Sequence, residues 1–251
     1  IRMKTIHLFY VSILALIMPV SAIYAEDESS FSFGLVYISS EPIYLNANAI
    51  SRLMPLLRYD GENVSVSFQE GVSYQILNGS ASSFTISVAP KFKPYDSSDS
   101  LALNGMDRKM YFDGSAAAFY TISRGLTAKF KYSKEFTNEF NGDAVDLSLS
   151  QFIPVAGVPV IVTAGSKWYD GNRSEYLYGV YSAEATSQRS QYAPSDGFVH
   201  YLGLNAFYKI TDSIGIFSNI NVNFLPAAVK NSPIISDKNT ISFIIGLGYR
   251  F

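Results

Sequence analysis

Several segments of the chain alternate between apolar side chains and polar or small ones. The last eleven residues, 241–251, do so most clearly. Their apolar positions are Ile241, Phe243, Ile245, Leu247, Tyr249 and Phe251. Because successive side chains of a strand point to opposite faces, this pattern predicts a strand with one wholly apolar face. The segment is long enough for a tilted strand to cross a bilayer, so we expect that face to contact lipid.

The same pattern recurs upstream, with polar and charged side chains on the second face. That face carries Asn219, Asn221 and Asn223 in the segment 213–225, and Lys129 and Lys131 in the segment 125–135. Lysine and asparagine side chains need water, so we expect them to line a wet lumen. A soluble β-sandwich alternates in the same way, with its apolar face in the core. Alternation alone therefore leaves both folds open.

The N-terminal segment has the order of features that is typical of a secretory signal peptide. It contains the basic residues Arg2 and Lys4, then the apolar stretch 6–20, then the small residues Ser21, Ala22 and Ala25. We predict a signal peptide over 1–25, with cleavage after Ala25 or Ala22, and a mature domain over 26–251. A retained anchor is the alternative, but the apolar stretch is short for a spanning helix.

A secreted chain with lipid-facing strands must close its sheet, because an open sheet leaves unpaired amides in hydrocarbon. We therefore expect an all-β fold, a transmembrane antiparallel up-and-down β-barrel. The final Phe251, preceded by Gly246 and Tyr249, resembles the signal that the bacterial barrel-assembly machinery reads. These features predict a multi-pass barrel in the outer membrane of a Gram-negative bacterium, in contact with outer-membrane lipid and lipopolysaccharide.

The lengths of the connections predict the number of strands, because periplasmic turns of such barrels are short and external loops are long. Counting back from a periplasmic Phe251 gives about ten strands. We expect them at 30–38, 63–77, 82–92, 112–122, 125–135, 143–153, 157–167, 198–209, 213–225 and 241–251. The apolar segments 53–59 and 176–181 are then extensions outside the membrane. If both join the wall, the barrel has twelve strands.

Glu70 conflicts with this assignment, because it falls on the lipid-facing side of the predicted strand 63–77. A carboxylate in contact with lipid is destabilising. A bulge at Glu70–Gly71 or a change of register would turn the side chain inward, and the sequence leaves these alternatives open.

Composition excludes several classes of function. The chain has 19 basic and 21 acidic residues, which does not suggest a nucleic-acid partner. It has no cysteine, so it forms no disulfide and carries no lipoprotein attachment site. The content of 18 tyrosines and 18 phenylalanines fits aromatic girdles at the membrane interfaces, although a tyrosine-rich soluble β-protein has a similar composition.

No catalytic, cofactor-binding or metal-binding residues are predicted. The mature chain has one histidine, His200, on the same face as Phe198 and Leu202, and no serine lies two residues after it. We expect a structural histidine near a membrane interface. The acidic loop residues could bind calcium or bridge lipopolysaccharide through divalent ions, but a solvated loop is the preferred interpretation. These residues are Asp96, Asp99, Asp107, Asp170 and Glu175.

The second half of the chain carries separated motifs that are similar to those of a known family. They include Trp-Tyr-Asp at 168–170, Tyr-Leu-Tyr-Gly-Val at 176–180, a Tyr-to-Gly step at 192–197, Asn-Ser-Pro at 231–233 and the closing strand. Together they resemble the MipA/OmpV family of outer-membrane proteins, the MltA-interacting proteins. The matching family-motif residues outside the last strand are Trp168, Asp170, Tyr176, Tyr178, Gly179, Tyr192, Gly197, Ser232 and Pro233. The first loop, 40–47, departs from the family pattern, and Leu177 replaces the usual phenylalanine.

The resemblance implies a non-catalytic outer-membrane barrel that scaffolds peptidoglycan enzymes, namely a lytic transglycosylase and a murein synthase. Other members of the family are described as surface adhesins or channel-like proteins, so a surface adhesin or a narrow solute channel is the alternative. An enzyme is disfavoured because the sequence offers no pair of nucleophile and base. Fold carries over between relatives better than function does.

Overall fold

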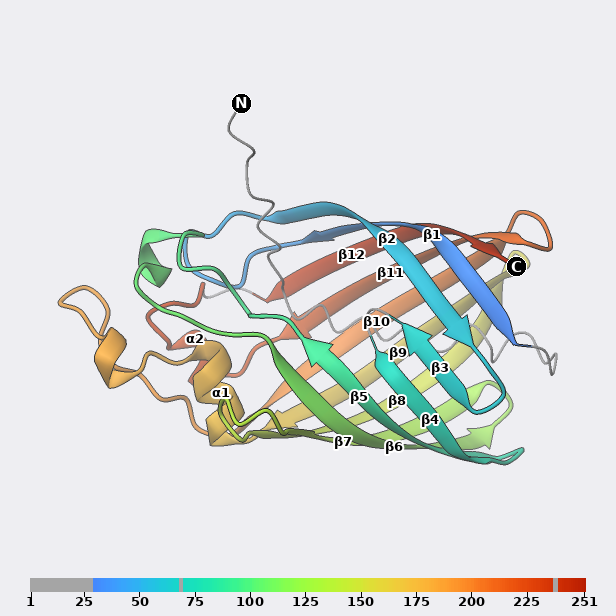
Figure 1. The fold of residues 1–251 in the computed structure, drawn as a ribbon, viewed down its shortest axis with the longest axis horizontal. Helices are drawn as coiled ribbons and strands as arrows, with labels where there is room; N and C mark the ends of the chain where they lie inside the picture. The colour runs from blue at the N-terminus through green and yellow to red at the C-terminus, as the bar shows by residue number, and fades with distance from the viewer. Residues whose placement is uncertain (1–28, 68–69, 237–238) are drawn as a thin grey trace.

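The structure is a computed structural model that describes residues 29–67, 70–236 and 239–251. The predicted signal peptide lies outside the described residues. Twelve antiparallel strands form a closed barrel in which each strand pairs with its neighbour in the chain, and β12 pairs with β1 (Figure 1). The strands are β1 (Ser30–Ser40), β2 (Ile50–Asp60), β3 (Val64–Ser67), β4 (Gly71–Asn78), β5 (Ser82–Lys91), β6 (Tyr111–Ser123), β7 (Leu126–Glu135), β8 (Asp143–Val155), β9 (Val158–Tyr169), β10 (Gly197–Lys209), β11 (Ile214–Phe224) and β12 (Thr240–Arg250).

Short helices occur only in the loops of the described part of the chain. They are η2 (Leu101–Leu103), α1 (Gly171–Tyr178), η3 (Ser182–Glu184) and α2 (Ala227–Lys230). Within the described residues, none of these helices has the length and the apolar character needed to span a membrane.

The two faces of the closing strand lie as the alternation predicts. Leu247 and Tyr249 of β12 point outward and are 50% and 43% exposed, whereas Ile244 points inward and is fully buried. In β11 the amides Asn219 and Asn221 also point inward and are buried. The predicted all-β barrel is confirmed, with an apolar outer belt and a polar lumen.

The number of strands corrects the count of ten and agrees with the alternative of twelve. The segment 53–59 joins the wall within β2, as that alternative required. The segment 176–181 does not, because it forms the end of α1 and the residues after it. The additional strand comes instead from the predicted strand 63–77, which is a hairpin of two strands, β3 and β4.

The β3–β4 connection also resolves the conflict at Glu70. Gly71 has φ +69°, a conformation that glycine adopts without the steric cost of a side chain. A Cβ atom at Gly71 would lie 2.0 Å from the carbonyl oxygen of Val88. The reversal turns the Glu70 side chain to the inside of the wall, where a carboxylate oxygen lies 3.7 Å from a guanidinium nitrogen of Arg58.

The barrel has two different ends. At the short-turn end, on the right in Figure 1, the connections are 61–63, 79–81, 124–125, 156–157 and 210–213. At the long-loop end, on the left, the loops are 41–49, 92–110, 136–142, 170–196 and 225–239. This alternation of short and long connections matches the sequence prediction, except that β3 and β4 are joined by a tight connection on the long-loop side.

Candidate functional site in the barrel lumen

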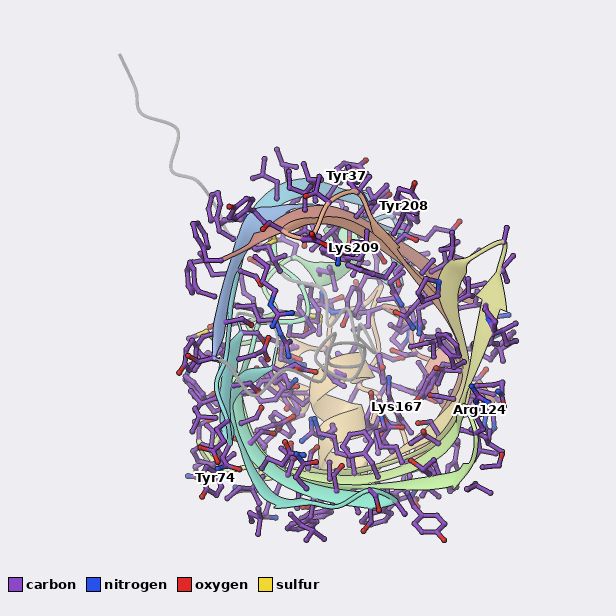
Figure 2. The ribbon with its side chains drawn as sticks, turned by 90° about the vertical axis from the view of Figure 1, so that its right-hand side faces the viewer. Tyr37, Tyr74, Arg124, Lys167, Tyr208 and Lys209 are labelled. Atoms are coloured by element: carbon purple, nitrogen blue, oxygen red, sulfur yellow. The ribbon has the colours of Figure 1, made fainter. Side chains whose placement is uncertain are left out.

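The barrel encloses a cavity of about 1510 Å³. Figure 2 looks into it from the short-turn end and shows Lys167 and Lys209 pointing inward, while Tyr74 and Tyr208 point away from the lumen. The cavity lining reaches from the short turns, for example Thr211, to side chains under the long-loop end. The lumen is therefore a concave surface that a ligand could occupy.

A buried polar cluster lies on the luminal face of β7 to β10. The carboxylate of Asp146 accepts a hydrogen bond of 2.8 Å from the Lys129 amine and one of 2.9 Å from the Tyr201 hydroxyl. The Lys167 amine lies 4.3 Å from the centre of the Tyr201 ring, in a cation–π arrangement. A Cβ atom at Gly165 would lie 2.3 Å from Tyr201, so a glycine is needed for the ring to cross β9.

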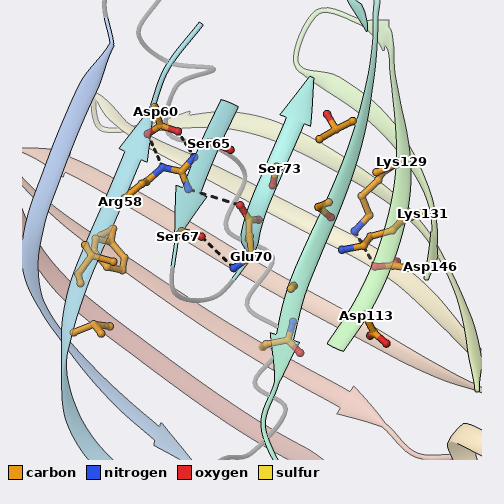
Figure 3. A pocket seen from close by; sticks show the side chains of 18 of the residues that line it. Arg58, Asp60, Ser65, Ser67, Glu70, Ser73, Asp113, Lys129, Lys131 and Asp146 are labelled. Carbon is orange, nitrogen blue, oxygen red and sulfur yellow. Dashed lines mark hydrogen bonds and ion pairs between the residues drawn. The ribbon is translucent and has the colours of Figure 1, made fainter. Parts of the chain in front are cut away.

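Three luminal lysines give this region an excess of positive charge. Lys91, Lys131 and Lys167 line the cavity, and within the described residues no carboxylate lies within 4.0 Å of their amines. The nearby carboxylates of Asp146 and Asp113 are paired with Lys129 and with Arg173 instead. Figure 3 shows Lys129 and Lys131 beside Asp146, across the lumen from Arg58. An anionic ligand would supply the negative charge that these amines lack.

The sequence predicts part of this cluster, because the alternation places Lys129 and Lys131 in the lumen. Tyr201 and Lys167 were missed as members of the cluster. The sequence does contain a signal for Tyr201. Phe198, His200 and Leu202 define the outward face of β10, which places Tyr201 on the inward face.

We expect Tyr201→Phe to destabilise the barrel by about 1.5–3 kcal/mol, because Asp146 then loses a charge-assisted hydrogen bond. The measurement is urea unfolding of the refolded chain in lipid vesicles. Tyr208→Phe is the matched control, since Tyr208 is on the same strand, points outward and is 57% exposed. A loss of stability as small as that of the control would show that the hydrogen bond to Asp146 does not stabilise the lumen.

The long-loop end is covered by a cluster of buried side chains, which we call the cap. Its members come from loops on opposite sides of the barrel and pack on one another. They are Tyr44, Tyr95, Leu103, Met106, Tyr111, Tyr176, Leu177, Tyr178, Val180, Val199, Leu225, Val229, Ile234 and Ile235. Because it joins loops from opposite sides, the cap lies across the end of the lumen. Burial raises the pKa of the Tyr44 and Tyr178 hydroxyls well above the ordinary value, so both stay neutral at physiological pH.

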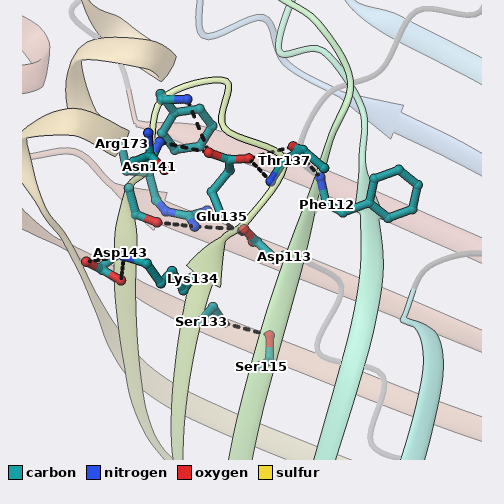
Figure 4. Close-up of polar contacts among 12 residues, drawn as sticks. Phe112, Asp113, Ser115, Ser133, Lys134, Glu135, Thr137, Asn141, Asp143 and Arg173 are labelled. Atoms are coloured by element: carbon teal, nitrogen blue, oxygen red, sulfur yellow. Dashed lines mark hydrogen bonds and ion pairs between the residues drawn. The ribbon is translucent and has the colours of Figure 1, made fainter.

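Two buried arginines hold the cap together and join it to the barrel. Arg173 of α1 donates hydrogen bonds of 3.1 and 2.8 Å to the two carboxylate oxygens of Asp113 on β6 (Figure 4). Arg108 binds both carboxylate oxygens of Glu184, at 2.5 and 3.1 Å, and its guanidinium carbon lies 4.3 Å from the centre of the Tyr181 ring. Both pairs are bidentate, a geometry that orients the partners as well as attracting them.

A third charged group, Glu135, fixes the loop 136–142 next to the cap. Its carboxylate is fully buried and accepts hydrogen bonds from the backbone of Thr137, Phe140 and Asn141 (Figure 4). The loop then presents Phe140, whose ring stacks on Tyr176 of the cap with the ring centres 4.2 Å apart. The carboxylate thus replaces the missing hydrogen-bond partners of a loop that has no secondary structure.

Most of the family-motif residues lie in the cap or beside it, in the loops at the same end of the barrel. Asp170 accepts a hydrogen bond of 2.8 Å from the backbone N–H of Arg173 and so caps α1 at its N-terminus. The hydroxyl of Tyr176 donates to the backbone of Lys109 at 2.6 Å. At Gly179, a Cβ atom would lie 2.9 Å from the carbonyl oxygen of Tyr192, so the chains can approach only at a glycine.

The remaining motif residues link the loop 170–196 to its neighbours. Tyr192 donates to the carbonyl oxygen of Ala228 at 2.7 Å, and Ser232 donates to that of Tyr178 at 2.6 Å. Pro233 follows Ser232 and is half-buried. Two motif residues lie at the rim of the barrel instead. Trp168 donates to a carboxylate oxygen of Asp196 at 3.4 Å, and Gly197 begins β10.

The histidine and the acidic loop residues that the sequence singles out lie in different parts of the described structure. His200 is exposed on the outer face, the face that the alternation predicts, and stacks on Phe198 with the ring centres 6.4 Å apart. Asp96 accepts hydrogen bonds from Ser98, while Asp99 accepts one from the backbone N–H of Asp96. Within the described part of the chain, no group of three or more candidate ligand residues could hold a metal ion.

The predicted barrel-assembly residues occupy the seam between the first and last strands. Tyr249 and Phe251 both point outward, and their rings are 4.7 Å apart. The backbone N–H of Phe251 donates to the carbonyl oxygen of Phe31 at 2.9 Å. Gly246 faces inward beneath the ring of Phe217, which a Cβ atom would approach to 2.1 Å. Their role as an assembly signal stays a prediction.

Comparisons with known proteins found a family model and several relatives that the chain resembles. A family model, MltA-interacting protein MipA, matches residues 33–251. Putative outer membrane protein YiaT of Escherichia coli K12 is 27% identical over 240 residues, which cover 93% of this chain and 95% of the relative. Outer membrane protein OmpV of Vibrio cholerae is 25% identical over 58% of this chain and 56% of its own. Among solved structures, the NanC porin covers 88% of this chain and 98% of its own, with 11% identity and a TM-score of 0.43.

Proposed function

The chain belongs to the MipA family of MltA-interacting proteins, and on this premise we propose that it is a non-enzymatic scaffold that docks peptidoglycan enzymes in the periplasm. It is a β-barrel of the outer membrane, as its relatives are named and as its closed sheet with an apolar belt requires. The partners that the family name suggests are a lytic transglycosylase and, through it, a murein synthase.

The two ends of the barrel favour docking at the short-turn end. The cap lies across the long-loop end, whereas the lumen opens between the short turns. Those turns present polar groups to solvent, including Arg124 and Asp212, whose side chain is fully exposed. With the short turns in the periplasm, as in other barrels of this class, these groups face the cell wall. The cap obstructs the straight path that a solute channel would need, so docking is the better supported function.

The proposal extends to assembly and to the lipid around the barrel. The outer belt would contact outer-membrane lipid and lipopolysaccharide. Gly246, Tyr249 and Phe251 would be read by the barrel-assembly machinery. Both inferences are supported by the position of the closing strand, whose outward face is apolar along its whole length.

Photo-crosslinking in living cells tests the docking proposal. A photoreactive amino acid is placed at Arg124 or at Asp212, on two different short turns, and at Ser187 in the long-loop end as the control. All three residues are exposed. We expect a lytic transglycosylase or a murein synthase among the products of the two turn positions and not among those of Ser187.

Heat-modifiable gel mobility shows that each variant forms a folded barrel. If folded variants crosslink to no cell-wall enzyme from either turn, the docking proposal is wrong. Equal capture from Ser187 would also contradict it, because the partner would then reach the opposite end of the barrel.

A further inference from the structure

The barrel wall is incomplete between β2 and β5. β3 has 4 residues, and β2, which has 11, pairs with it only through Arg58, Tyr59 and Asp60. On its other side β2 pairs with β1 over its whole length. In Figure 1, β2 and β5 separate above the β3–β4 hairpin on the side of the long loops. Among the described residues, β2 therefore pairs on this side only near its end, and no strand pairs with it from Ile50 to Pro55.

On the free edge of β2, a proline occupies a position at which a backbone N–H would have no partner strand to bind. The backbone N–H of Gly61 donates to the carbonyl oxygen of Val64, toward β3. Backbone N–H and C=O groups alternate in direction along a strand, so every second residue of β2, counted back from Gly61, also directs these groups toward this edge. Pro55 is in this series, and its nitrogen points into the opening. A proline has no N–H, so it does not leave a donor unpaired there.

The facing edge of β5 repeats this feature. The carbonyl oxygen of Ser82 accepts a hydrogen bond from Gly79, so the even-numbered residues of β5 direct their backbone groups toward β4. Pro90 is one of them, and it lies beyond Val88, the last residue of β5 that pairs with β4. Both edges of the opening therefore carry a proline whose nitrogen points into it, which indicates that the opening is a built feature of the wall.

The cavity reaches the outer surface at this point. Along β2 and β5 the side chains of Pro55 and Pro90 belong to the outward series, together with Leu53 and Val88. Nevertheless both prolines line the cavity. Leu53 is 66% exposed and Val88 is 47% exposed, so the opening, which we call the side window, has apolar lips toward the bilayer.

Positive charge lies just inside the side window. Lys91 follows Pro90 in β5 and points into the lumen, and Lys131 of β7 is close enough for the two charges to interact. Neither amine has a carboxylate within 4.0 Å among the described residues. An apolar passage to the bilayer thus ends at two amines that have no carboxylate in direct contact, while Glu70, Asp113 and Asp146 act on them only at longer range.

We propose that the side window binds a single-chain anionic amphiphile of the long-chain fatty-acid type. Its carboxylate would pair with Lys91 and Lys131, and its acyl chain would pass between Pro55 and Pro90 into the bilayer. The apolar lips match the acyl chain, and the amines match the head group in charge. A single chain fits an opening one short hairpin wide. This inference goes beyond the docking function and does not rest on it.

A photoreactive fatty acid tests the proposal. The full chain is refolded in phosphatidylcholine vesicles with palmitic acid that carries a diazirine close to its carboxylate, and labelled residues are mapped by mass spectrometry. We expect labels to concentrate on residues 50–57 and 86–92. The uncharged palmityl alcohol with the same diazirine should not show this preference. Equal labelling of Leu147 and Leu149, on the lipid-facing side of β8, would overturn the proposal, because it would show only contact with surrounding lipid.

Charge variants test the head-group site. The double variant Lys91→Gln and Lys131→Gln should weaken fatty-acid binding at least about tenfold, because two charge-assisted contacts are lost. Lys134→Gln is the matched control, since Lys134 lies on the same strand as Lys131 but points outward and pairs with Asp143. Unchanged labelling in the double variant would overturn the proposal. If that variant does not fold, the comparison of acid with alcohol on the native chain still decides.

Discussion

Asp113→Ala is expected to destabilise the barrel by about 3–5 kcal/mol, because it leaves the buried guanidinium of Arg173 without its carboxylate. The two side chains are 4% and 5% exposed, so water does not replace the lost partner. The pair also joins α1 to the wall, and we expect the cap to loosen before the strands separate. Urea unfolding in lipid vesicles measures the stability, and limited proteolysis of the loop 170–196 measures the loosening of the cap.

Asp143→Ala is the matched control for this variant. Asp143 also pairs with a basic side chain at the long-loop rim, but Lys134 is 50% exposed and Asp143 is 29% exposed. An exposed ion pair contributes about 0–1 kcal/mol, so the control should remain close to the native protein. Similar losses in the two variants would show that burial of the Arg173–Asp113 pair has no special effect on stability.

Leu149→Arg should destabilise the barrel in a bilayer by about 2–4 kcal/mol, because it places a charge near the middle of the hydrocarbon. Leu149 lies midway along β8, points outward and is 50% exposed. Val155→Arg, on the same face at the short-turn end, should cost about 0–1 kcal/mol, since an arginine there reaches the interface. The measurement is reversible unfolding in vesicles, followed by the fluorescence of the single tryptophan, Trp168.

The difference between these two positions is a direct test of the lipid-facing belt. In water both substitutions are at exposed sites, and surface substitutions usually change stability by less than about 0.5 kcal/mol. Equal effects of Leu149→Arg and Val155→Arg in vesicles would therefore contradict a bilayer around the barrel. A larger effect at Leu149 would instead show that the medium around the outer face is less polar at the middle of the barrel than at its short-turn end.

The sequence predicts the regular part of this fold well because each long strand has one solvent on each side. In β11 and β12, the alternation of isoleucine with asparagine or glycine identifies the outward and inward faces. The same logic places Lys129 and Lys131 in the lumen. When a strand is paired on both sides and each of its faces carries one kind of side chain, the alternation with a period of two residues is enough to predict the strand.

Prediction fails where a local backbone feature interrupts the period. The apolar residues on both sides of Glu70 continue the alternation and therefore predict a single strand over 63–77. In the structure the chain reverses at Gly71 instead. The signal was the carboxylate itself, which is destabilising on a lipid-facing strand. Pro55 was a second unused signal, because a proline within a strand indicates an edge.

The cap was beyond sequence reasoning for a different reason. The segment 176–181 is apolar and aromatic enough for a strand. However, the hydroxyl of Tyr176 donates a hydrogen bond to Lys109, and the carbonyl oxygen of Tyr178 accepts one from Ser232, and both partners lie in distant loops. Long-range contacts of this kind override local propensity. Family motifs identified two members of the cap, Tyr176 and Tyr178, although their spacing did not show that a helix, α1, would carry both.

The pairing of β1 with β12 has a consequence for how the protein is made. Ser32 pairs with Arg250, so the contact that closes the sheet joins β1 to β12, two strands that are far apart in the chain. Until β12 has been synthesised and exported, any partial sheet keeps two exposed edges that can pair with other chains. Contacts so distant in sequence also form slowly. We therefore expect the nascent polypeptide to depend on periplasmic chaperones until its full length is available for insertion.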